Sequence, residues 1–189
     1  MPGSYTATVI VGDGALRDST TFEVRGDPRI EMEMADYEAW HSAAQSLVDL
    51  MSQSNVMLDQ MTSLQTQLGS LKENVGAADL ANLDAVREQI DTADAQLGEL
   101  RNKLQRPPPR MSYRQYPRLS DEISRLLGSI AGVQAHPTEG QMTVLAELET
   151  EIAARRQELQ GIIDGAIREL NQMLGNLPAV VVPGREMIP

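Results

Sequence analysis

Acidic side chains at helical spacing are the first residues in this sequence that could do chemistry. Asp84, Glu88 and Asp91 stand at positions i, i+4 and i+7, which places them on one face of a helix. Glu147 and Glu151 are four residues apart and share a face in the same way. Paired carboxylates can serve glycoside hydrolysis or bind a hard cation. Because such stripes are routine on exposed helices, we interpret both sets as solvated helix faces.

Glu38 and His41 have the Glu-x-x-His spacing that puts two metal ligands on one helix face, as in di-iron proteins. A di-metal site needs this motif from two helices. The only other histidine, His136, has Val133 at the position where the second glutamate would stand. We therefore predict no metal-binding residue.

Familiar catalytic motifs are missing from the sequence. It has no cysteine, and it contains no Gly-x-Ser-x-Gly, no phosphate-binding loop and no His-Glu-x-x-His. Gly12 and Gly14 lack the third glycine and the following helix of a dinucleotide-binding loop. We predict that this segment is not an enzyme, that it has no catalytic residue and that it binds no cofactor.

The segment 106–118 is basic and carries no acidic residue. Its candidate interaction residues are Arg106, Arg110, Tyr113, Arg114, Tyr116 and Arg118. Guanidinium groups bind carboxylates through paired donors and tyrosine rings stack, so this basic strip could dock an acidic partner or a polysaccharide. In the alternative interpretation the arginines pair with neighbouring acidic helices and the tyrosines cover the end of the helical part.

Composition limits the partners of the chain. Its 189 residues include 27 acidic and 16 basic side chains, for a net charge of −11. A negative surface repels nucleic acid, so we predict no nucleic-acid binding. No apolar run approaches the roughly 20 residues that a membrane span needs. The first four residues have neither the basic nor the apolar region of a signal peptide.

The elements that would position these residues begin with a predicted β-hairpin. Residues 4–11 alternate and are rich in β-branched side chains, Gly12 and Gly14 favour a turn, and residues 20–24 form a return strand. The expected apolar face consists of Tyr5, Ala7, Val9 and Val11, joined by Phe22 or Val24. Two strands alone are marginally stable in water. We interpret residues 1–29 as the end of an immunoglobulin-like segment with its exit linker, and we expect the earlier strands upstream of Met1.

Residues 30–177 have helical periodicity, and residues 178–189 are expected to form an extended tail over the end of the helical part. Helices are predicted at about 34–75, 79–105, 119–134 and 139–176, with the Arg/Pro linker at 106–118 between the second and the third. The predicted apolar stripe of the first helix is Tyr37, Trp40, Ala44, Leu47, Met51, Leu58, Met61, Leu68 and Val75, widened by Leu50, Met57, Leu64 and Leu71. The second helix is predicted to bury Leu83, Val86, Ile90, Ala93, Leu97, Leu100 and Leu104, and the third Leu119, Ile123, Leu126, Leu127, Ile130 and Val133. The short connection after Gly76 implies an antiparallel pair. The predicted fold is mainly α, an elongated antiparallel three- to four-helix bundle of coiled-coil type.

Two features of these helices have alternative interpretations. A methionine-rich face near the start of the first helix is either core or an adaptable binding surface, and it consists of Met32, Met34, Met51, Met57 and Met61. Its heptad positions favour core. In the last helix, Gly161 and Gly165 are either weak points or sites of close contact.

The order of motifs resembles one known group of proteins. The chain has a Pro-Gly-Ser-Tyr-Thr-Ala-Thr-Val strand at 2–9, Asp-Pro-Arg at 27–29, and a long helical hairpin. Tyr-Pro-Arg-Leu-Ser-Asp-Glu-Ile follows at 116–123, with Leu-Gly at 127–128, Pro-Thr at 137–138 and Leu-Pro-Ala-Val-Val-Val-Pro at 177–183. This order is similar to the C-terminal region of bacterial sortilin-like (Vps10-type) Asp-box (BNR) repeat proteins, often labelled glycosyl hydrolases.

The resemblance implies a parent protein with β-propellers first, then a small immunoglobulin-like segment, and a helical region last. It also implies export to the periplasm or the cell exterior. No Asp-box is present in this chain, so no propeller activity is carried over to any of its residues.

The leading functional hypothesis is a non-catalytic interaction or spacer module, with its own upstream domains or another protein as partner. One alternative is an accessory part of a glycosidase- or peptidase-like hydrolase whose site lies upstream, which assays on this chain and on its parent would distinguish. A third hypothesis is a structural subunit that self-associates by strand exchange, which light scattering against concentration would detect.

Overall fold

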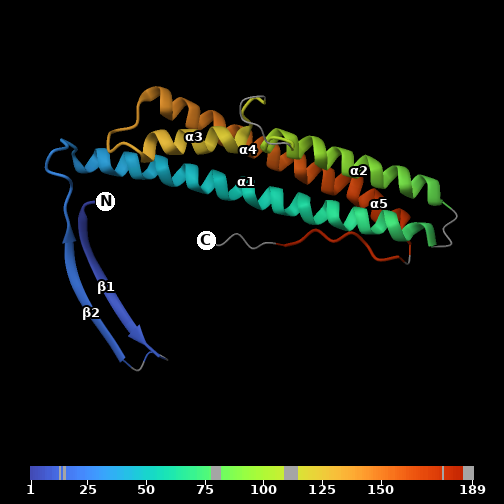
Figure 1. Cartoon of the computed structure of the whole chain (residues 1–189), viewed down its shortest axis with the longest axis horizontal. Helices are drawn as coiled ribbons and strands as arrows, with labels where there is room; N and C mark the ends of the chain where they lie inside the picture. Colours follow the sequence, from blue (N-terminus) through green and yellow to red (C-terminus); the bar gives the residue numbers. More distant parts are fainter. Residues whose placement is uncertain (13, 15, 78–81, 109–114, 176, 185–189) are drawn as a thin grey trace.

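A computed structural model describes residues 1–12, 14, 16–77, 82–108, 115–175 and 177–184. The chain is mainly helical and carries one two-stranded antiparallel hairpin (Figure 1). The strands are β1 (Gly3–Val11) and β2 (Leu16–Val24). The helices are α1 (Met34–Asn74), a short 3-10 turn η1 (Val75–Ala77), α2 (Leu83–Leu104), α3 (Leu119–Ala131), α4 (Glu139–Ile162), a π-helical segment η2 (Ile163–Ile167) and α5 (Arg168–Met173).

The hairpin has one apolar and one polar face. Its register pairs Tyr5 with Phe22 and Val11 with Leu16, and opposite residues in an antiparallel pair share a face. The predicted apolar residues therefore share one face, and β2 adds Leu16, Phe22 and Val24 to it, together with two polar residues, Asp18 opposite Val9 and Thr20 opposite Ala7. The Tyr5 and Phe22 rings stack with centroids 6.1 Å apart. On the other face the hydroxyls of Thr6 and Thr21 lie 3.2 Å apart.

Tyr37 of α1 packs against the exit from β2. A Cβ atom placed on Gly26 would lie 2.5 Å from the Tyr37 hydroxyl, so this contact requires glycine. The Tyr37 side chain is buried. The linker then turns at Asp27, whose carboxylate accepts hydrogen bonds from the backbone N–H and the guanidinium of Arg29.

Helix α1 is the longest element, with 41 residues, or about 60 Å at 1.5 Å per residue. Its buried positions follow an alternating spacing of three and four residues, which gives one apolar seam. The seam consists of Ala43, Leu47, Leu50, Ser54, Met57, Met61, Leu64 and Leu68. Met57 and Met61 are therefore core, as predicted, whereas Met34 is half exposed. The predicted stripe missed Ala43 and Ser54 and included Ala44 and Leu58, which are only partly buried.

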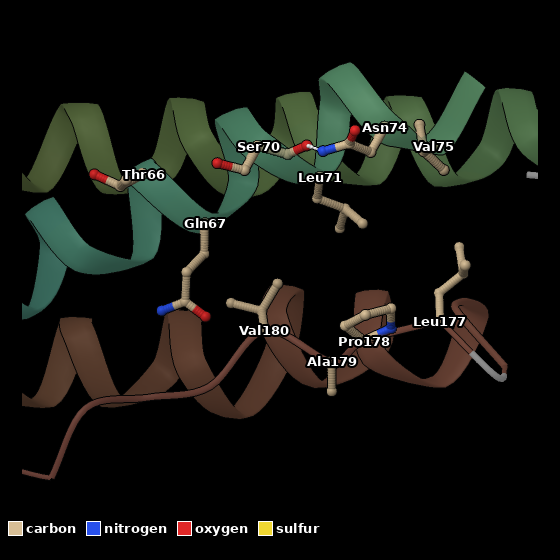
Figure 2. Close-up of a pocket in the computed structure, with 10 residues that line it drawn as sticks. All are labelled: Thr66, Gln67, Ser70, Leu71, Asn74, Val75, Leu177, Pro178, Ala179 and Val180. Atoms are coloured by element: carbon tan, nitrogen blue, oxygen red, sulfur yellow. Dashed lines mark hydrogen bonds between the residues drawn. The ribbon is translucent and has the colours of Figure 1, made fainter. Parts of the chain in front are cut away.

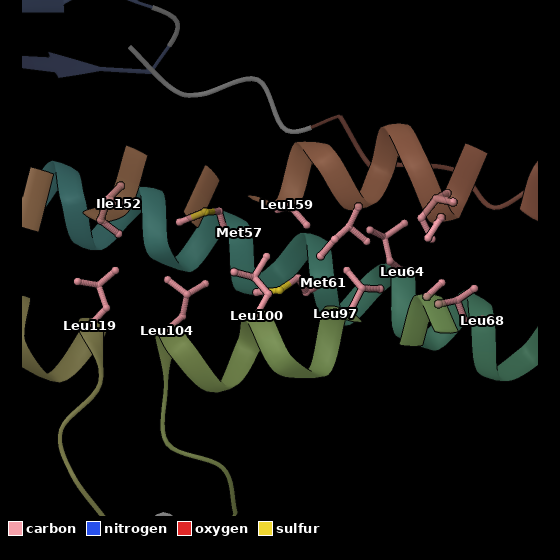
Figure 3. Close-up of a cluster of buried hydrophobic side chains, with 14 of the residues drawn as sticks. Met57, Met61, Leu64, Leu68, Leu97, Leu100, Leu104, Leu119, Ile152 and Leu159 are labelled. Carbon is pink, nitrogen blue, oxygen red and sulfur yellow. The ribbon is translucent and has the colours of Figure 1, made fainter. Parts of the chain in front are cut away.

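The other helices bury matching seams against α1. The buried residues of α2 were all predicted from the sequence: Val86, Ile90, Ala93, Leu97, Leu100 and Leu104. Figure 3 shows leucine and methionine side chains of α1, α2 and α3 meeting Ile152 and Leu159 of α4 in a single cluster. Each seam fills the space left by the others, and close packing of this kind contributes most of the stability of long helices.

Helices α2 and α3 follow one another along the same side of α1 (Figure 1). Helix α2 packs on α1 and α4, and α3 packs on α1 and α4 further along. The return path α4–η2–α5 then runs the length of both. Along most of its length the helical part therefore has three mutually packed helices, α1, α4 and either α2 or α3.

Hydrogen bonds fix where α3 lies against α1. The Trp40 indole N–H donates to the carbonyl of Ile130 at 2.7 Å, near the C-terminal end of α3. At the other end, the Ser54 and Ser120 hydroxyls lie 2.9 Å apart. Helix α3 ends at Ala131, three residues before its predicted end, so Val133 is exposed rather than part of the seam.

The last predicted helix is divided by the π-helical segment η2. Neither Gly161 in α4 nor Gly165 in η2 has another atom within 4 Å of an added Cβ. The close-contact interpretation of these glycines is therefore wrong. Gln89 of α2 donates to the carbonyl of Ala166 inside η2 at 3.0 Å, which gives this segment a partner outside its own helix.

Residues 177–184, which we call the strap, follow Gly175 in an extended conformation. Gly175 has φ +60°, a left-handed conformation that suits glycine at a helix end. The strap runs back along α1, antiparallel to it, because Val181 contacts Gln67 and Pro183 contacts Gln60. The prediction that the tail covers the end of the helical part is wrong for these residues, which lie along its side (Figure 1).

Candidate functional site

Among the described residues of the basic strip, Arg106 contacts other parts of the chain, whereas the ring of Tyr116 is exposed. Arg106 is largely buried, forms an ion pair with Asp121 at 3.3 Å and donates from Nε to the carbonyl of Tyr116. The Tyr116 side chain itself is 87% exposed and covers nothing. Arg106 thus pairs with a neighbouring helix, as the alternative interpretation expected. The same interpretation expected the tyrosines to cover the end of the helical part, and this is wrong for Tyr116. Arg110, Tyr113 and Arg114 lie outside the described residues.

Arg118 ends the strip and begins α3. Its backbone N–H donates to the Asp121 carboxylate at 2.9 Å, which caps the helix. The side-chain Nε of Arg118 is buried and has no hydrogen-bond partner among the described residues. The same is true of the side-chain oxygen of Gln115. Arg106, through its guanidinium, and Arg118, through its backbone N–H, therefore both contact the carboxylate of Asp121 in the first turn of α3.

The candidate carboxylates lie on solvent-exposed helix faces. Asp84, Glu88 and Asp91 are exposed on α2, and Asp91 pairs with Lys72 of α1. Glu147 and Glu151 are exposed on α4. These positions agree with the interpretation of both sets as solvated faces.

Glu38 and His41 are also exposed, on the first turns of α1. The second histidine, His136, instead lies beside Asp36, with Nδ1 and Oδ1 3.1 Å apart. Within the described ranges no cluster of three or more His, Asp or Glu side chains has the geometry of a metal site.

Two exposed carboxylates have perturbed acidity. Hydrogen bonds from Arg29 lower the pKa of Asp27, and the same contact raises the pKa of Arg29. Hydrogen bonds from Gln160 and then Arg168 lower the pKa of Asp164. Both are local pairs on the surface, and among the described residues that line the hollow beside Asp27 there is no histidine and no second carboxylate.

The hairpin presents an apolar face with no partner in the described part of the chain. Val9 and Leu16 are 64% and 69% exposed, and neither strand contacts any helix. Strand β1 contains no charged residue and no proline, and it pairs with β2 without a bulge. Natural edge strands are commonly protected by charge, proline or bulges, so β1 is an edge suited to further pairing.

The most specific polar geometry involves the strap and was not predicted. Asn171 of α5 donates to the carbonyl of Val180 at 2.9 Å and accepts from its N–H at 2.8 Å. Gln67 of α1 makes the same pair of hydrogen bonds with Val181, both at 2.8 Å. Two neighbouring residues of an extended segment are thus each held by a side-chain amide, from opposite sides.

A cavity of about 320 Å³ lies between the strap and α1 (Figure 2). Its apolar lining comes from Leu71, Val75, Leu177, Pro178, Ala179 and Val180. Thr66, Gln67, Ser70 and Asn74 line its polar part. Leu71 points from α1 toward the strap, and the Gln67 amide reaches down beside Val180. Sequence reasoning missed Gln67 and Asn171 because isolated amides in a polar helix face have no distinguishing pattern.

None of the described helices has a stretch long and apolar enough to cross a membrane. Comparison of the chain with protein-family models, with curated proteins and with solved structures finds no match.

Proposed function

We propose that this chain is a non-catalytic interaction and spacer module of a larger exported protein. In this proposal the helices form an elongated, coiled-coil-like bundle. The hairpin completes an immunoglobulin-like sandwich that follows a β-propeller. The observation that carries the proposal is the amphipathic hairpin, whose apolar face contacts none of the helices. Export and the propeller rest on the resemblance of the sequence motifs alone.

The two faces of the hairpin support a role in a sandwich. Antiparallel sheets commonly have one face on a core and the other in water. The polar face has this surface character, because Thr8 and Ser19 hydrogen-bond to each other at 3.0 Å. The opposite face, with Tyr5 stacked on Phe22, is mainly apolar, and its polar residues are Thr20 and Asp18 in the middle of β2. Burying it would contribute roughly 25 cal/mol for each Å² removed from water.

The helical part supports a spacer role. Its seams run continuously along α1, and the hairpin joins it at one end through the contact between Gly26 and Tyr37. A partner held by the hairpin would therefore stand at one end of a body about 60 Å long.

Amide hydrogen exchange on this chain and on the longer gene product tests the proposal. We expect the backbone amides from Thr6 to Val11 to become markedly better protected in the longer product, because further strands cover β1. Asp-box repeats encoded ahead of Met1 would support the propeller. Strong protection of the same amides in a dilute monomer of this chain would show that the hairpin needs no further strands.

The basic strip is the proposed second contact, with an acidic partner. Arg106 is unsuitable for a test because it pairs with Asp121 and its replacement would disturb α3. We expect the double change of Arg110 and Arg114 to Glu to weaken binding of poly-L-glutamate at low salt. Changing Arg87 and Arg156, which are exposed on other helices, is the matched control. Equal loss from both pairs would mean that net charge, and not the strip, determines binding.

Strand exchange between copies is the second candidate function, favoured by the unprotected edge of β1. It predicts that molecular mass measured by light scattering rises with concentration. The change Thr8→Pro would prevent this by removing a backbone N–H from the middle of β1, whereas Val48→Lys on the exposed side of α1 would not. A constant monomer mass over the full concentration range would exclude this function.

A further inference from the structure

The strap is held as a bound peptide would be. In an extended chain the N–H and C=O of one residue point to one side, and those of the next residue point to the other side. Asn171 engages both groups of Val180, and Gln67 engages both groups of Val181. The two amides thus replace the neighbouring strands on the two sides of a central strand.

The hydrogen bonds read the backbone of the strap rather than its side chains. An amide side chain offers one acceptor and two donors, so it matches any extended residue that has a free N–H. Gln60 extends the series by donating to the carbonyl of Pro183 at 3.5 Å. It precedes Gln67 by seven residues, two helical turns, so both amides line the same face of α1.

Side-chain selection is limited to the positions that face the helices. Val180 is buried and belongs to the core, and Val182 packs against it, whereas Val181 between them is 64% exposed. This alternation selects apolar residues at every second position. The cavity beside Ala179 and Pro178 leaves room for larger side chains than the strap supplies.

The strap is held by side chains rather than by backbone pairing. Its only backbone–backbone hydrogen bond among the described residues joins Leu177 to Leu174, at its own base. The groove between the strap and α1 is partly open to solvent, and the strap does not fill it. Gly175 at the base supplies a conformation that allows the chain to leave α5 at a sharp angle.

We infer that the groove between α1 and α5 is a binding site for an extended peptide segment of a partner protein. The strap occupies this site within the same chain and is displaced on binding. The matching segment has an apolar, β-branched residue at the Val180 position, a second apolar residue two positions on, and free N–H groups at the two clamped positions. The site is separate from the hairpin and the basic strip, so its test is independent of the proposed function.

The test uses the full chain with Val180→Pro and Val181→Pro together. This double change removes both clamped N–H groups from the strap but leaves Gln67 and Asn171 intact. The probe is a fluorescent peptide with the sequence of residues 177–183. An intramolecular strap competes at an effective concentration in the millimolar range, so we expect the peptide to bind the variant at least tenfold more tightly than the unchanged chain.

Two controls test whether the side-chain amides of Gln67 and Asn171 bind the peptide. A peptide carrying the same two prolines should not bind, and adding Gln67→Met and Asn171→Leu to the opened variant should abolish binding of the original peptide. Equal affinity for the opened and unchanged chains, or binding that survives loss of both amides, would overturn the inference. If the unchanged chain forms a dimer in which each copy places its strap in the groove of the other, the inference is overturned. The groove would then bind a second copy of this chain and not a partner protein.

A direct measurement guards against misfolding of the proline variant. In the isotope-labelled unchanged chain, excess unlabelled peptide should shift the backbone amide resonances of Val180 and Val181, which leave the groove, while the helical circular dichroism stays the same. Unchanged resonances at millimolar peptide would contradict displacement of the strap.

Discussion

Ser54 shows how one polar residue can set the alignment of two helices. It occupies a core position of the α1 seam with no exposed surface, and its hydroxyl meets that of Ser120 in the first turn of α3. A buried hydroxyl without a partner costs about 1–3 kcal/mol. Any sliding of α3 along α1 would break this contact, so the pair favours a single register, as polar core residues do in coiled coils.

We expect Ser120→Ala to lower the free energy of unfolding by about 1 kcal/mol, because it leaves the buried Ser54 hydroxyl without its partner. Ser54→Ala should lower it less, because the Ser120 hydroxyl is partly exposed and can bond to water. The double variant should lose less than the sum, since no hydroxyl is then left without a partner. Urea denaturation of the four proteins measures the coupling. Ser52→Ala, on the exposed side of the same helix, is the control; strictly additive losses would show that the two hydroxyls act independently.

The acidity of Asp164 predicts a pH-dependent contribution to stability. Its pKa is lowered in the folded chain by hydrogen bonds from Gln160 and Arg168. A carboxylate with a depressed folded pKa stabilises the fold above its unfolded pKa of about 4, and this contribution is lost as the pH falls through the folded pKa. We expect Asp164→Asn to be less stable than the unchanged chain at pH 7, with the difference shrinking toward pH 3.

Urea midpoints at several pH values would measure this difference. Glu147→Gln, an exposed change on the preceding helix, should show no such trend. A stability difference for Asp164→Asn that is the same at pH 7 and pH 3 would mean that the charge of Asp164 contributes nothing.

At the scale of elements, glycine lowers the helix propensity inside α4 and occupies the position after the last residue of α3. Gly161 is inside α4 with open space around it, so its only effect is to lower helix propensity. Gly132 follows the last residue of α3, and a Cβ there would lie 2.7 Å from the carbonyl oxygen of Gly128. The end of α3 therefore depends on the missing side chain of Gly132.

We expect Gly161→Ala to raise the free energy of unfolding by about 0.5–1 kcal/mol through reduced backbone freedom of the unfolded chain. Gly132→Ala should lower it, because the backbone must shift to relieve the clash. Thermal unfolding followed by circular dichroism compares the two. A stabilising Gly132→Ala would mean that the end of α3 adapts without strain.

The sequence predicted the elements wherever an apolar period ran unbroken. On α2 the positions from Val86 to Leu104 were all correct, because seven-residue spacing and the absence of polar interruptions leave one solution. On α1 the polar Ser54 broke the pattern, and the predicted stripe moved onto neighbouring residues such as Ala44. Ser54 becomes a core residue only because Ser120, 66 positions later, satisfies its hydroxyl.

The candidate sites were predictable to a smaller degree. The apolar face of the hairpin followed from strand alternation, and register added Leu16 to it. Gln67 and Asn171 could not be identified, since their role depends on an extended segment that returns along α1 after a turn at Gly175. Arg106 looked like a docking residue because its partner, Asp121, belongs to a helix whose position was unknown.

The whole molecule is an elongated helical body with a hairpin at one end (Figure 1). Three helices side by side share one core, which includes residues from Ala43 to Val180. Long helices in water are stabilised mainly by such packing. Unfolding should therefore be cooperative across the helical part and should not proceed helix by helix.

We expect a helix-dominated circular dichroism spectrum at neutral pH with one cooperative thermal transition. Small-angle X-ray scattering should give a maximum dimension above about 60 Å, the length of α1 alone. A strand-dominated spectrum or a spherical particle would contradict the arrangement. Two separate transitions would show that the halves of α1, packed on α3 and α2, melt independently.

The in-line arrangement of α2 and α3 bears on how such a body changes length during evolution. Insertion of one heptad lengthens a helix by about 10 Å and keeps its seam in phase. With three continuous helices, matched insertions would be needed in all three at once. Here the third position is shared by α2 and α3, which the segment 105–118 connects, so a heptad inserted in α1 and in α4 can be matched in either α2 or α3. The length of the helical part can thus change in steps of one heptad, with the segment between α2 and α3 absorbing any difference.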